Sequence, residues 1–319
     1  MASKRFLVVR DSAPAGALRG AVLAMGNFDG VHRGHQAVIA AAIGRAKEFD
    51  CPAGVLTFEP HPRDFFHPGE PLFRLTDEDT KLRLLAAAGL DGAVVLTFNA
   101  ALARTTADEF VARILVERFA VSGVIVGFNF HFGKDRAGSP TFLTEQGSKY
   151  GFAVDIVPPF ELDGRPVSSG PIRDALVAGR VTDAALLLGF PWFVSGKIIH
   201  GDKRGRELGF PTANLKLPAT CGLRHGVYAV RVGVGGRRYD GVANFGRRPM
   251  FDSGAVLLEV FLFDFAGNLY DRAIDVAFID WIREEKLFGS VGDLVRAMES
   301  DSTKARAVLA AAGDIFPPV

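Results

Sequence analysis

Two histidines, His32 and His35, stand three residues apart in the segment "MGNFDGVHRGH" (25–35), directly after an apolar run. Gly26 and Gly30 allow the backbone to turn sharply and to come close to a bound group. The helix predicted to follow would offer free N–H groups and a partial positive charge to an anion. Residues at this spacing share one helix face, so both imidazoles would meet the same phosphate. A nearby phosphate raises the pKa of an imidazole. The two histidines could then stabilise the negative charge that develops on the phosphate during transfer.

Other interpretations of this pair remain open. A single histidine at a helix start is more often a cap or a surface residue, and two histidines can bind a metal. Metal binding by the protein alone is the less favoured alternative because the Glu of an HExxH motif is absent. The segments "FGKD" and "SGKI" lack the upstream glycine and the Ser or Thr of a Walker A motif, and no GxGxxG occurs. A nucleotide bound here would therefore use another cradle.

A second group of chemically useful residues lies in "GKIIHGDKRGRELGFPTANL" (196–215). Its first half is basic and rich in glycine, which is typical either of a loop that closes over polyphosphate or of a solvated hairpin. Pro211 stiffens the backbone before Thr212 and Asn214, whose side chains point the same way on an extended chain. A hydroxyl and an amide oxygen on one face suit Mg²⁺ together with phosphate.

The composition narrows the class of protein. The chain has 319 residues, with 37 Lys and Arg against 36 Asp and Glu, and its formal net charge of +1 gives no indication of nucleic-acid or membrane-surface binding. Cys51 and Cys221 are far apart and lack metal-ligand spacing, so we expect a reduced, cytoplasmic setting. No run of 18 apolar residues occurs, so we expect no membrane span. The oligomeric state is not decided, and weak homo-oligomerisation stays open.

The first part of the chain must position the histidine pair. Its apolar runs are continuous and of strand length, as buried parallel strands require. The segments 34–49 and 106–120 have helical spacing, and Thr106 with Glu109 is typical of a capping box. Strand–helix repetition predicts an α/β doubly wound sheet. The predicted strands are 21–25, 53–58, 92–98, 122–128 and 152–157.

The pattern changes near residue 190, where short strand-like runs separated by turn residues predict a small antiparallel barrel. Gly235–Gly236 predicts a tight hairpin, and residues 266–268 predict another. Ser290 with Asp293 predicts the start of a helix that continues to about residue 312. The predicted strands are 193–199, 226–234, 237–245, 256–263 and 273–281.

The segment "GNFDGVHRGH" resembles the HxGH signature of nucleotidylyltransferases, in the form carried by the bifunctional riboflavin kinase/FMN adenylyltransferase family, the prokaryotic FAD synthetases. The segments "LTFEPHPRDFF" (56–66), "VGFNFHFGKDRAG" (126–138) and "VSSGPIRDAL" (167–176) agree with that family in the same order. The resemblance implies a Rossmann-like domain over residues 1–187 that transfers AMP from ATP to FMN and releases pyrophosphate.

The resemblance also implies roles for single residues of this first domain. His32, His35 and Arg173 would be catalytic, meeting the α-phosphate from two sides. Phe58, Pro60 and His61 would flank the flavin, although their loop is equally well explained as a rigid surface loop. Asn129 would contact phosphate, or is simply a turn former. The residues assigned to ATP and phosphate binding are Gly26, Asn27, Phe28, Gly34, Asn129, Ser168 and Ser169.

One departure from the family pattern affects this domain. Gly170 stands where the family usually carries a hydroxyl residue, and the following Pro171 has no N–H to offer. A donor to the triphosphate is then missing unless the Gly170 N–H replaces it. An alternative therefore stays open, in which the chain is a riboflavin kinase with weak or absent adenylyltransferase activity.

The string 196–215, with "GVYAV" (226–230), "GVANFGRRPMF" (241–251), "LLEVFLFDF" (257–265) and "IREEKLF" (282–288), resembles the riboflavin kinase domain. The resemblance implies a six-stranded antiparallel barrel with a C-terminal helix over residues 188–319, which phosphorylates riboflavin with MgATP. Asp271 replaces a family glycine in the turn "NLYD" and puts the shape of that loop in question.

Glu259 matches the catalytic glutamate of this family and would act as general base, whereas strand alternation alone would point it to water. The resemblance assigns Thr212 and Asn214 to Mg²⁺ as well as to ATP, and it assigns Arg283 and Phe288 to the flavin. The residues assigned to ATP in this domain are Gly201, Lys203, Thr212 and Asn214.

We therefore expect a two-domain enzyme that makes FMN and then FAD from riboflavin and ATP, with Mg²⁺. Two further alternatives come from other classes of protein. A flavin- or nucleotide-binding regulator would keep the folds without catalysis. A nucleic-acid-binding barrel is disfavoured, because the chain has neither a basic excess nor an aromatic platform signature.

Overall fold

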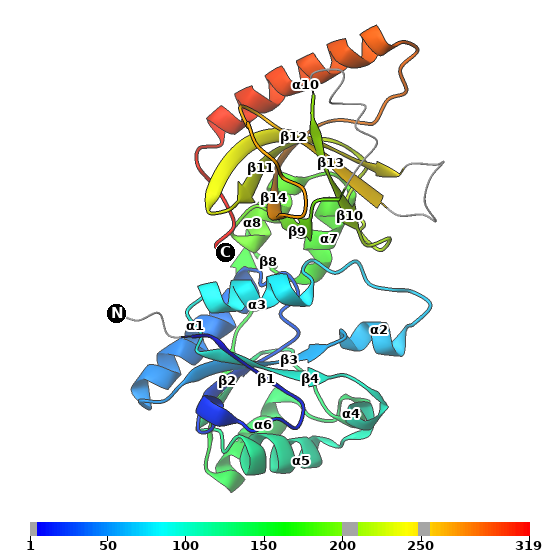
Figure 1. Cartoon of the computed structure of the whole chain (residues 1–319). Coiled ribbons are helices and arrows are strands. Elements are labelled where there is room, and N and C mark those ends of the chain that lie inside the picture. The colour runs from blue at the N-terminus through cyan, green and yellow to red at the C-terminus, as the bar shows by residue number, and fades with distance from the viewer. Residues whose placement is uncertain (1–4, 200–209, 248–255) are drawn as a thin grey trace. The chain divides into compact units, whose positions relative to one another are not determined.

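The computed structural model describes residues 5–199, 210–247 and 256–319, which form two compact units (Figure 1). Unit 1 is built from Met1–Leu72, Thr76–Ser168 and Pro318–Val319, and unit 2 from Phe73–Leu75 and Ser169–Pro317. We describe each unit by itself. The predicted functional division after residue 187 stays a prediction, although the helices after residue 168 pack in unit 2.

Unit 1 contains a six-stranded parallel sheet with strand order β1-β4-β3-β2-β5-β6. Five of its strands coincide with the predicted apolar runs, while β1 was not predicted. After β2, the chain adds β3 and β4 on one side of β2, and then β5 and β6 on its other side. The strand order therefore reverses between β2 and β5, where open parallel sheets bind their ligands. The strands are β1 (Leu7–Arg10), β2 (Val22–Met25), β3 (Ala53–Glu59), β4 (Gly92–Thr97), β5 (Gly123–Gly127) and β6 (Ala153–Val157).

Helices cover this sheet, as the strand–helix repetition predicts. Helix α1 packs on β2, β3 and β5, and Phe110, Leu115 and Leu143 join strand side chains in one buried cluster. The capping box of Thr106 and Glu109 is confirmed, but the helix it starts continues as a π-helix. The helices and the short hairpin are η1 (Gly16–Leu18), α1 (Arg33–Glu48), α2 (Pro62–Phe66), α3 (Glu78–Ala87), α4 (Ala100–Arg104), α5 (Ala107–Glu109), η2 (Phe110–Arg118), η3 (Lys134–Arg136), α6 (Pro140–Tyr150), β7 (Glu161–Leu162) and β8 (Arg165–Pro166).

Unit 2 contains a six-stranded antiparallel sheet with strand order β10-β13-β12-β11-β14-β9. A bridge between Ile199 and Asn214 joins the two edges and nearly closes the barrel. Helices α7 and α8 pack against one part of it, and α10 is the predicted C-terminal helix, capped by Ser290. The elements are α7 (Ser169–Val177), α8 (Val181–Leu188), β9 (Phe193–Lys197), β10 (Thr212–Leu217), β11 (Gly226–Val234), β12 (Arg237–Arg247), β13 (Val256–Leu262), β14 (Ala273–Arg283) and α10 (Val291–Ala311).

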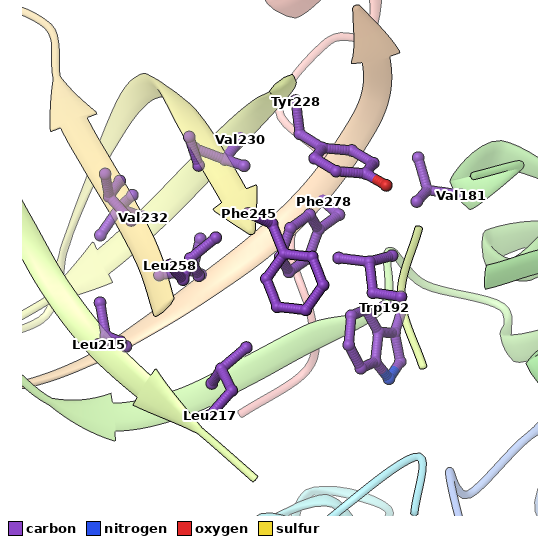
Figure 2. Packing of buried hydrophobic residues seen from close by; sticks show 14 of the residues in the cluster. Val181, Trp192, Leu215, Leu217, Tyr228, Val230, Val232, Phe245, Leu258 and Phe278 are labelled. Atoms are coloured by element: carbon purple, nitrogen blue, oxygen red, sulfur yellow. The ribbon is translucent and has the colours of Figure 1, made fainter. Parts of the chain in front are cut away.

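The barrel interior is filled by apolar side chains. Figure 2 shows Leu215, Phe245 and Leu258 from three different strands pointing into the same cluster as Phe278 and Trp192. In β13, buried residues alternate with half-buried ones, as expected for a strand with one face toward a core. Polar residues of these strands must therefore lie on the opposite face of the sheet.

One predicted hairpin is confirmed and the other is wrong. Gly235 and Gly236 have φ of 58° and 76° and join β11 to β12 in antiparallel register. Residues 266–268 do not close a hairpin, because β13 pairs on its two edges with β10 and β12 and has no edge left for β14. The chain instead crosses to β14, which pairs with β11 and β9. Within the described residues, no helix is both long and apolar enough to cross a membrane.

Candidate functional sites

The loop between β2 and α1 carries the first site at the carboxyl edge of the parallel sheet. Phe28, Gly30 and Val31 have φ of 51°, 80° and 41°, a conformation that a β-branched residue rarely adopts. Three contacts hold this conformation: the Gly30 N–H donates to Thr76 Oγ1 at 3.1 Å, the Thr76 N–H donates to Asp29 Oδ1 at 3.1 Å, and Gln36 donates to the Val31 carbonyl at 2.8 Å. The loop is therefore a fixed feature of the fold.

The two histidines lie together at the start of α1. His32 is the N-cap, and its Nδ1 accepts the His35 N–H at 3.3 Å. The rings stack with centroids 3.6 Å apart, and Phe28 packs its edge against His35 at 5.2 Å. A Cβ on Gly34 would lie 3.1 Å from the His32 ring and from the Val167 carbonyl oxygen, so glycine leaves room for the imidazole. Burial, His32 and Lys81 together lower the pKa of His35 well below 6.5.

Lys81 was not predicted for this site. It lies on α3 and is fully buried, and its Nζ pairs with Glu59 Oε1 at 2.5 Å. The same Nζ lies 3.4 Å from Thr57 Oγ1 and 3.4 Å from the Asn27 carbonyl oxygen, which also accepts the Thr57 hydroxyl at 3.2 Å. The signal was present in the sequence: Lys81 stands at helical spacing from Leu84 and Leu85, on the apolar face of its helix.

The structure brings together six of the predicted residues of this site, Gly26, Asn27, Phe28, His32, Gly34 and His35, in one loop and helix start. Asn129 is exposed just after β5, the strand beside β2, and its carbonyl oxygen lies 3.0 Å from His131 Nδ1. Its contact with phosphate stays a prediction.

The predicted flavin residues follow β3. Phe58 is buried in the core and packs near Phe98 and Phe110, with ring centroids 6.0 Å and 6.5 Å away. His61 caps α2 by accepting the Arg63 N–H at 3.1 Å, and Pro60 precedes it. Their contacts with flavin stay predictions.

An aromatic group that was not assigned individually lies at the same carboxyl edge. Phe65 and Phe66 of α2 are exposed, and their rings lie 5.5 Å and 5.6 Å from that of Phe98, which follows β4. Exposed phenylalanines gathered in this way offer a flat apolar surface to a planar ligand.

The segment with the missing hydroxyl starts α7. Ser168 is exposed in unit 1, while Ser169 begins α7 in unit 2. Arg173 lies on the same helix and its Nε donates to the Phe73 carbonyl oxygen at 2.6 Å. Gly170 is exposed, and a Cβ at this position would meet nothing within 4 Å. A larger side chain at residue 170 would therefore fit.

The second site lies on the outer face of the barrel. Thr212 and Asn214 are outward residues of β10, since Ala213 and Leu215 between and after them are in the core. Asn214 pairs in register with Glu259 on β13, which is also an outward residue and is half-buried. The predicted common face of Thr212 and Asn214 thus includes Glu259 as a direct cross-strand neighbour.

The donor set of this second site fits Mg²⁺. Asn214 is buried, and its Oδ1 has no hydrogen-bond partner among the residues that the structure describes. A buried amide oxygen without a donor is costly unless a ligand satisfies it, and Mg²⁺ prefers such hard oxygens. Gly201 and Lys203, also predicted for ATP binding, lie outside the described residues. No group of three or more His, Cys, Asp or Glu side chains suited to a metal occurs in the described part of the chain.

Of the remaining predicted flavin residues, Arg283 ends β14 and Phe288 lies between β14 and α10. Arg283 makes a bidentate ion pair with Asp301 of α10, with Nη2 2.7 Å from Oδ2, and its guanidinium lies 5.6 Å from the Phe288 ring centroid. In this arrangement Arg283 fixes the strand to the helix. The Asp271 departure is accommodated, because Asp271 adopts a φ of 62°, the conformation that a glycine would take there.

Comparisons with known proteins match two successive parts of the chain to two different families. Residues 15–171 match the family described as FAD synthetase, and residues 188–309 match riboflavin kinase. The Pseudomonas fluorescens bifunctional riboflavin kinase/FMN adenylyltransferase is 45% identical over 92% of this chain and 94% of its own length. The Haemophilus influenzae protein of the same description is 39% identical over 91% and 94%. A crystal structure described as a macrolide-efflux protein from Streptococcus pneumoniae superposes with a TM-score of 0.83 at 31% identity, over 94% of this chain and 99% of that one.

Proposed function

The chain belongs to the bifunctional riboflavin kinase/FMN adenylyltransferase family, so it converts riboflavin to FMN and FMN to FAD with ATP, and we propose which of its residues carry out each reaction. The adenylyl transfer takes place at the stacked His32–His35 pair. The phosphoryl transfer takes place on the outer face of the barrel, at Thr212, Asn214 and Glu259. The stacking of the two imidazoles at 3.6 Å above a fixed loop is the observation that carries the first assignment.

In the adenylyl transfer, a phosphate oxygen of FMN attacks the α-phosphorus of ATP, and the bond to the departing pyrophosphate breaks. Negative charge grows on the α-phosphate and on the pyrophosphate. His32, His35 and the N–H groups at the start of α1 stabilise this charge, and Arg173 adds a planar cation that holds phosphate in two-point geometry. No covalent intermediate with the protein is needed, since positioning and electrostatics suffice.

Further groups bind the substrates of the adenylyl transfer. The backbone from Gly26 to Phe28, with Gly34, lines the nucleotide, and Asn129, Ser168 and Ser169 add polar contacts to phosphate. For the flavin ring, the exposed rings of Phe65 and Phe66 and the half-buried ring of Phe98 extend the predicted region of Phe58, Pro60 and His61.

In the phosphoryl transfer, Glu259 takes the proton of the riboflavin 5′-hydroxyl while that oxygen attacks the γ-phosphorus, and ADP leaves. Thr212 and Asn214 would hold Mg²⁺, which supplies charge neutralisation on the phosphates. Gly201 and Lys203 contact ATP phosphates, and Arg283 and Phe288 lie on the flavin side. The unpartnered Asn214 Oδ1 supports the metal assignment.

Reciprocal substitutions test both assignments in the full-length enzyme. Glu259→Gln should lower FMN formation about 10²–10⁴-fold, the range of a lost general base, and leave FMN-to-FAD conversion nearly unchanged. His32→Ala should do the reverse, with a loss of about 10²-fold or more. Chromatography of FMN and FAD from riboflavin and MgATP measures both. Loss of both activities in either folded variant would contradict two separate sites, and binding without turnover in the unaltered enzyme would favour a regulator.

A cytoplasmic location and the absence of nucleic-acid partners also belong to this proposal. The near-neutral charge of the chain supports the absence of nucleic-acid partners. The two cysteines, Cys51 and Cys221, are free, which supports a cytoplasmic location. Weak self-association is tested by sedimentation of the full chain over a range of concentrations.

A further inference from the structure

Three polar residues lie side by side across three strands of the barrel. Glu259 of β13 pairs in register with Asn214 of β10 on one side and with Asn244 of β12 on the other. The sequence neighbours Leu258 and Phe245 point into the core (Figure 2), so the three polar side chains share the outer face. We call Asn214, Glu259 and Asn244 the outer-face row. Asn244 has no role in the function described above.

A second carboxylate reaches this row from the segment after β14. Asn244 Nδ2 donates to Glu285 Oε1 at 3.3 Å, and Glu285 Oε2 lies 3.8 Å from His225 Nδ1. Gly246 shares the outer face with Asn244, two residues along β12, and a Cβ on Gly246 would overlap the Glu285 carboxylate. Glycine at residue 246 is therefore what leaves room for Glu285 beside Asn244.

We propose that Asn244, held by Glu285 over Gly246, is a positioning residue that orients the Glu259 carboxylate during the phosphorylation of riboflavin. This inference rests on the general-base role proposed for Glu259. A side-chain amide has two N–H donors, so one can bind Glu285 while the other faces the carboxylate on the next strand. Because the amide is neutral, it fixes the orientation of Glu259 without the cationic charge that would make this base weaker. It also stands between two carboxylates that would otherwise repel each other.

Kinetics of FMN formation by full-length variants test this role. Asn244→Ala should lower kcat about 10–100-fold, the loss expected from a misplaced catalytic group, with the KM values for riboflavin and ATP within about 3-fold. Glu285→Ala should lower kcat about 3–10-fold, and Glu285→Gln should restore most of it because glutamine keeps the accepting oxygen. Glu284→Ala is the matched control, since Glu284 is the adjacent carboxylate and pairs with Arg224 instead, and its kcat should be unchanged.

Gly246→Ala gives a second route to the same contact. It leaves Asn244 and Glu285 chemically intact and displaces only the Glu285 carboxylate, so its loss in kcat should match that of Glu285→Ala. Thermal unfolding and FMN-to-FAD conversion verify that each variant is folded. Unchanged kcat in folded Asn244→Ala, or in both Glu285→Ala and Gly246→Ala, overturns the proposal.

A double-mutant comparison separates this inference from the assignment of Glu259. In the Glu259→Gln background, adding Asn244→Ala should lower kcat for FMN formation by less than about 2-fold. A residue that acts through Glu259 has no carboxylate left to orient in that background. If Glu259→Gln alone keeps full FMN formation, the proposed base is wrong. If Glu259→Gln loses activity and Asn244→Ala multiplies that loss by its full single-variant factor, the base stands and the positioning role fails.

Discussion

His35 illustrates how a single residue is prepared for its chemistry. Its ring lies between Phe28 and His32, and burial with two neighbouring basic groups lowers its pKa. The histidine is therefore neutral in the free enzyme at neutral pH, while the raised pKa expected for a phosphate-bound imidazole stays a prediction. Bound phosphate opposes this lowering, so ATP binding favours proton uptake at the pair.

The lowered pKa of His35 predicts a pH dependence of folding stability. An unfolded His35 takes up a proton near pH 6.5 while the folded residue stays neutral, so the stability it contributes is complete above that pH and is lost as pH falls below it. Between pH 7.5 and pH 5.5, the urea concentration at the unfolding midpoint should fall more in the unaltered enzyme than in His35→Gln. Other titrating groups are common to both proteins, so equal slopes would contradict this account of His35.

Gly170 allows a direct test of the departure from the family pattern. Because the position is exposed and a Cβ meets nothing within 4 Å, Gly170→Ser should fold normally and add a hydroxyl at the start of α7. If the triphosphate lacks a donor, kcat/KM for ATP in FAD formation should rise about 3–10-fold, as for one added hydrogen bond to a charged group. FMN formation serves as the internal control. An unchanged or lower value would indicate that the Gly170 N–H already meets the phosphate.

At the residue scale, the sequence predicts what depends on short spacing and misses what depends on tertiary contacts. The common direction of His32 and His35, and the common face of Thr212 and Asn214, follow from helix and strand periodicity. Lys81, Asn244 and Glu285 come to the sites from other elements, and nothing in their local spacing indicates the residues they meet. Lys81 alone left a trace, as a charge on an apolar helix face.

At the scale of elements, the loop after β2 depends on its neighbours β3 and α3. Thr57 and Lys81 both donate to the Asn27 carbonyl, and Thr76 binds the loop at Asp29 and Gly30. A loop with three residues at positive φ would relax without such partners. The proposed nucleotide cradle is therefore built by three elements, although its motif lies in one.

Lys81→Met should disable this cradle selectively. We expect FAD formation to fall about 10–100-fold through loss of loop positioning, and FMN formation to stay within about 2-fold. Glu59 would be left without its cation, at a cost of about 3–5 kcal/mol, so the double variant Lys81→Met/Glu59→Gln should recover stability but not FAD formation. Lys47→Met, which removes an exposed lysine of α1, is the control. Full FAD formation in the folded double variant would contradict the positioning role.

Periodicity predicted most elements because their burial is one-sided or complete. Continuous apolar runs gave the central parallel strands, and short strand-like runs separated by turn residues gave most of the barrel strands. The edge strand β1 was missed because only Val9 of its four residues is buried, so its apolar signal is short. The second hairpin was wrong because strand pairing is decided by which edges are already occupied, a property of the whole sheet.

At the scale of the whole molecule, two activities share one chain while each compact unit has its own core. Unit 2 relies on one buried cation to hold its C-terminal segment. Arg231 of β11 binds Asp240 at 2.8 Å and donates to the carbonyl oxygens of Gly313 and Ile315 at 2.5 Å and 3.1 Å. These contacts fix the end of α10, the helix that also carries Asp301 for Arg283.

Arg231→Met should therefore destabilise unit 2. The carbonyl groups and Asp240 lose a buried donor, for which about 2–4 kcal/mol is expected. FMN formation should be lost at a lower temperature than in the unaltered enzyme, and FAD formation from supplied FMN should be lost with it, because Arg173 lies on α7, which packs in unit 2. Arg238→Met, which removes a half-exposed arginine paired with Asp314, is the matched control. An unchanged inactivation temperature of FMN formation in Arg231→Met would contradict the stabilising role of Arg231 in unit 2.

Core-facing and outward-facing residues alternate along β10, β12 and β13, and this alternation affects which substitutions such a kinase can accumulate during evolution. Residues of one parity fill the interior and are constrained by volume and apolarity, while Asn214, Asn244 and Glu259 of the other parity lie on the outer face and would be constrained by the geometry of the proposed reaction. Substitutions at 213, 243 and 258 should therefore alter heat tolerance without altering turnover, and those at 214, 244 and 259 the opposite. Homologues can therefore accumulate substitutions at the core-facing positions while the outward-facing positions stay unchanged, although both sets lie in the same short segments of sequence.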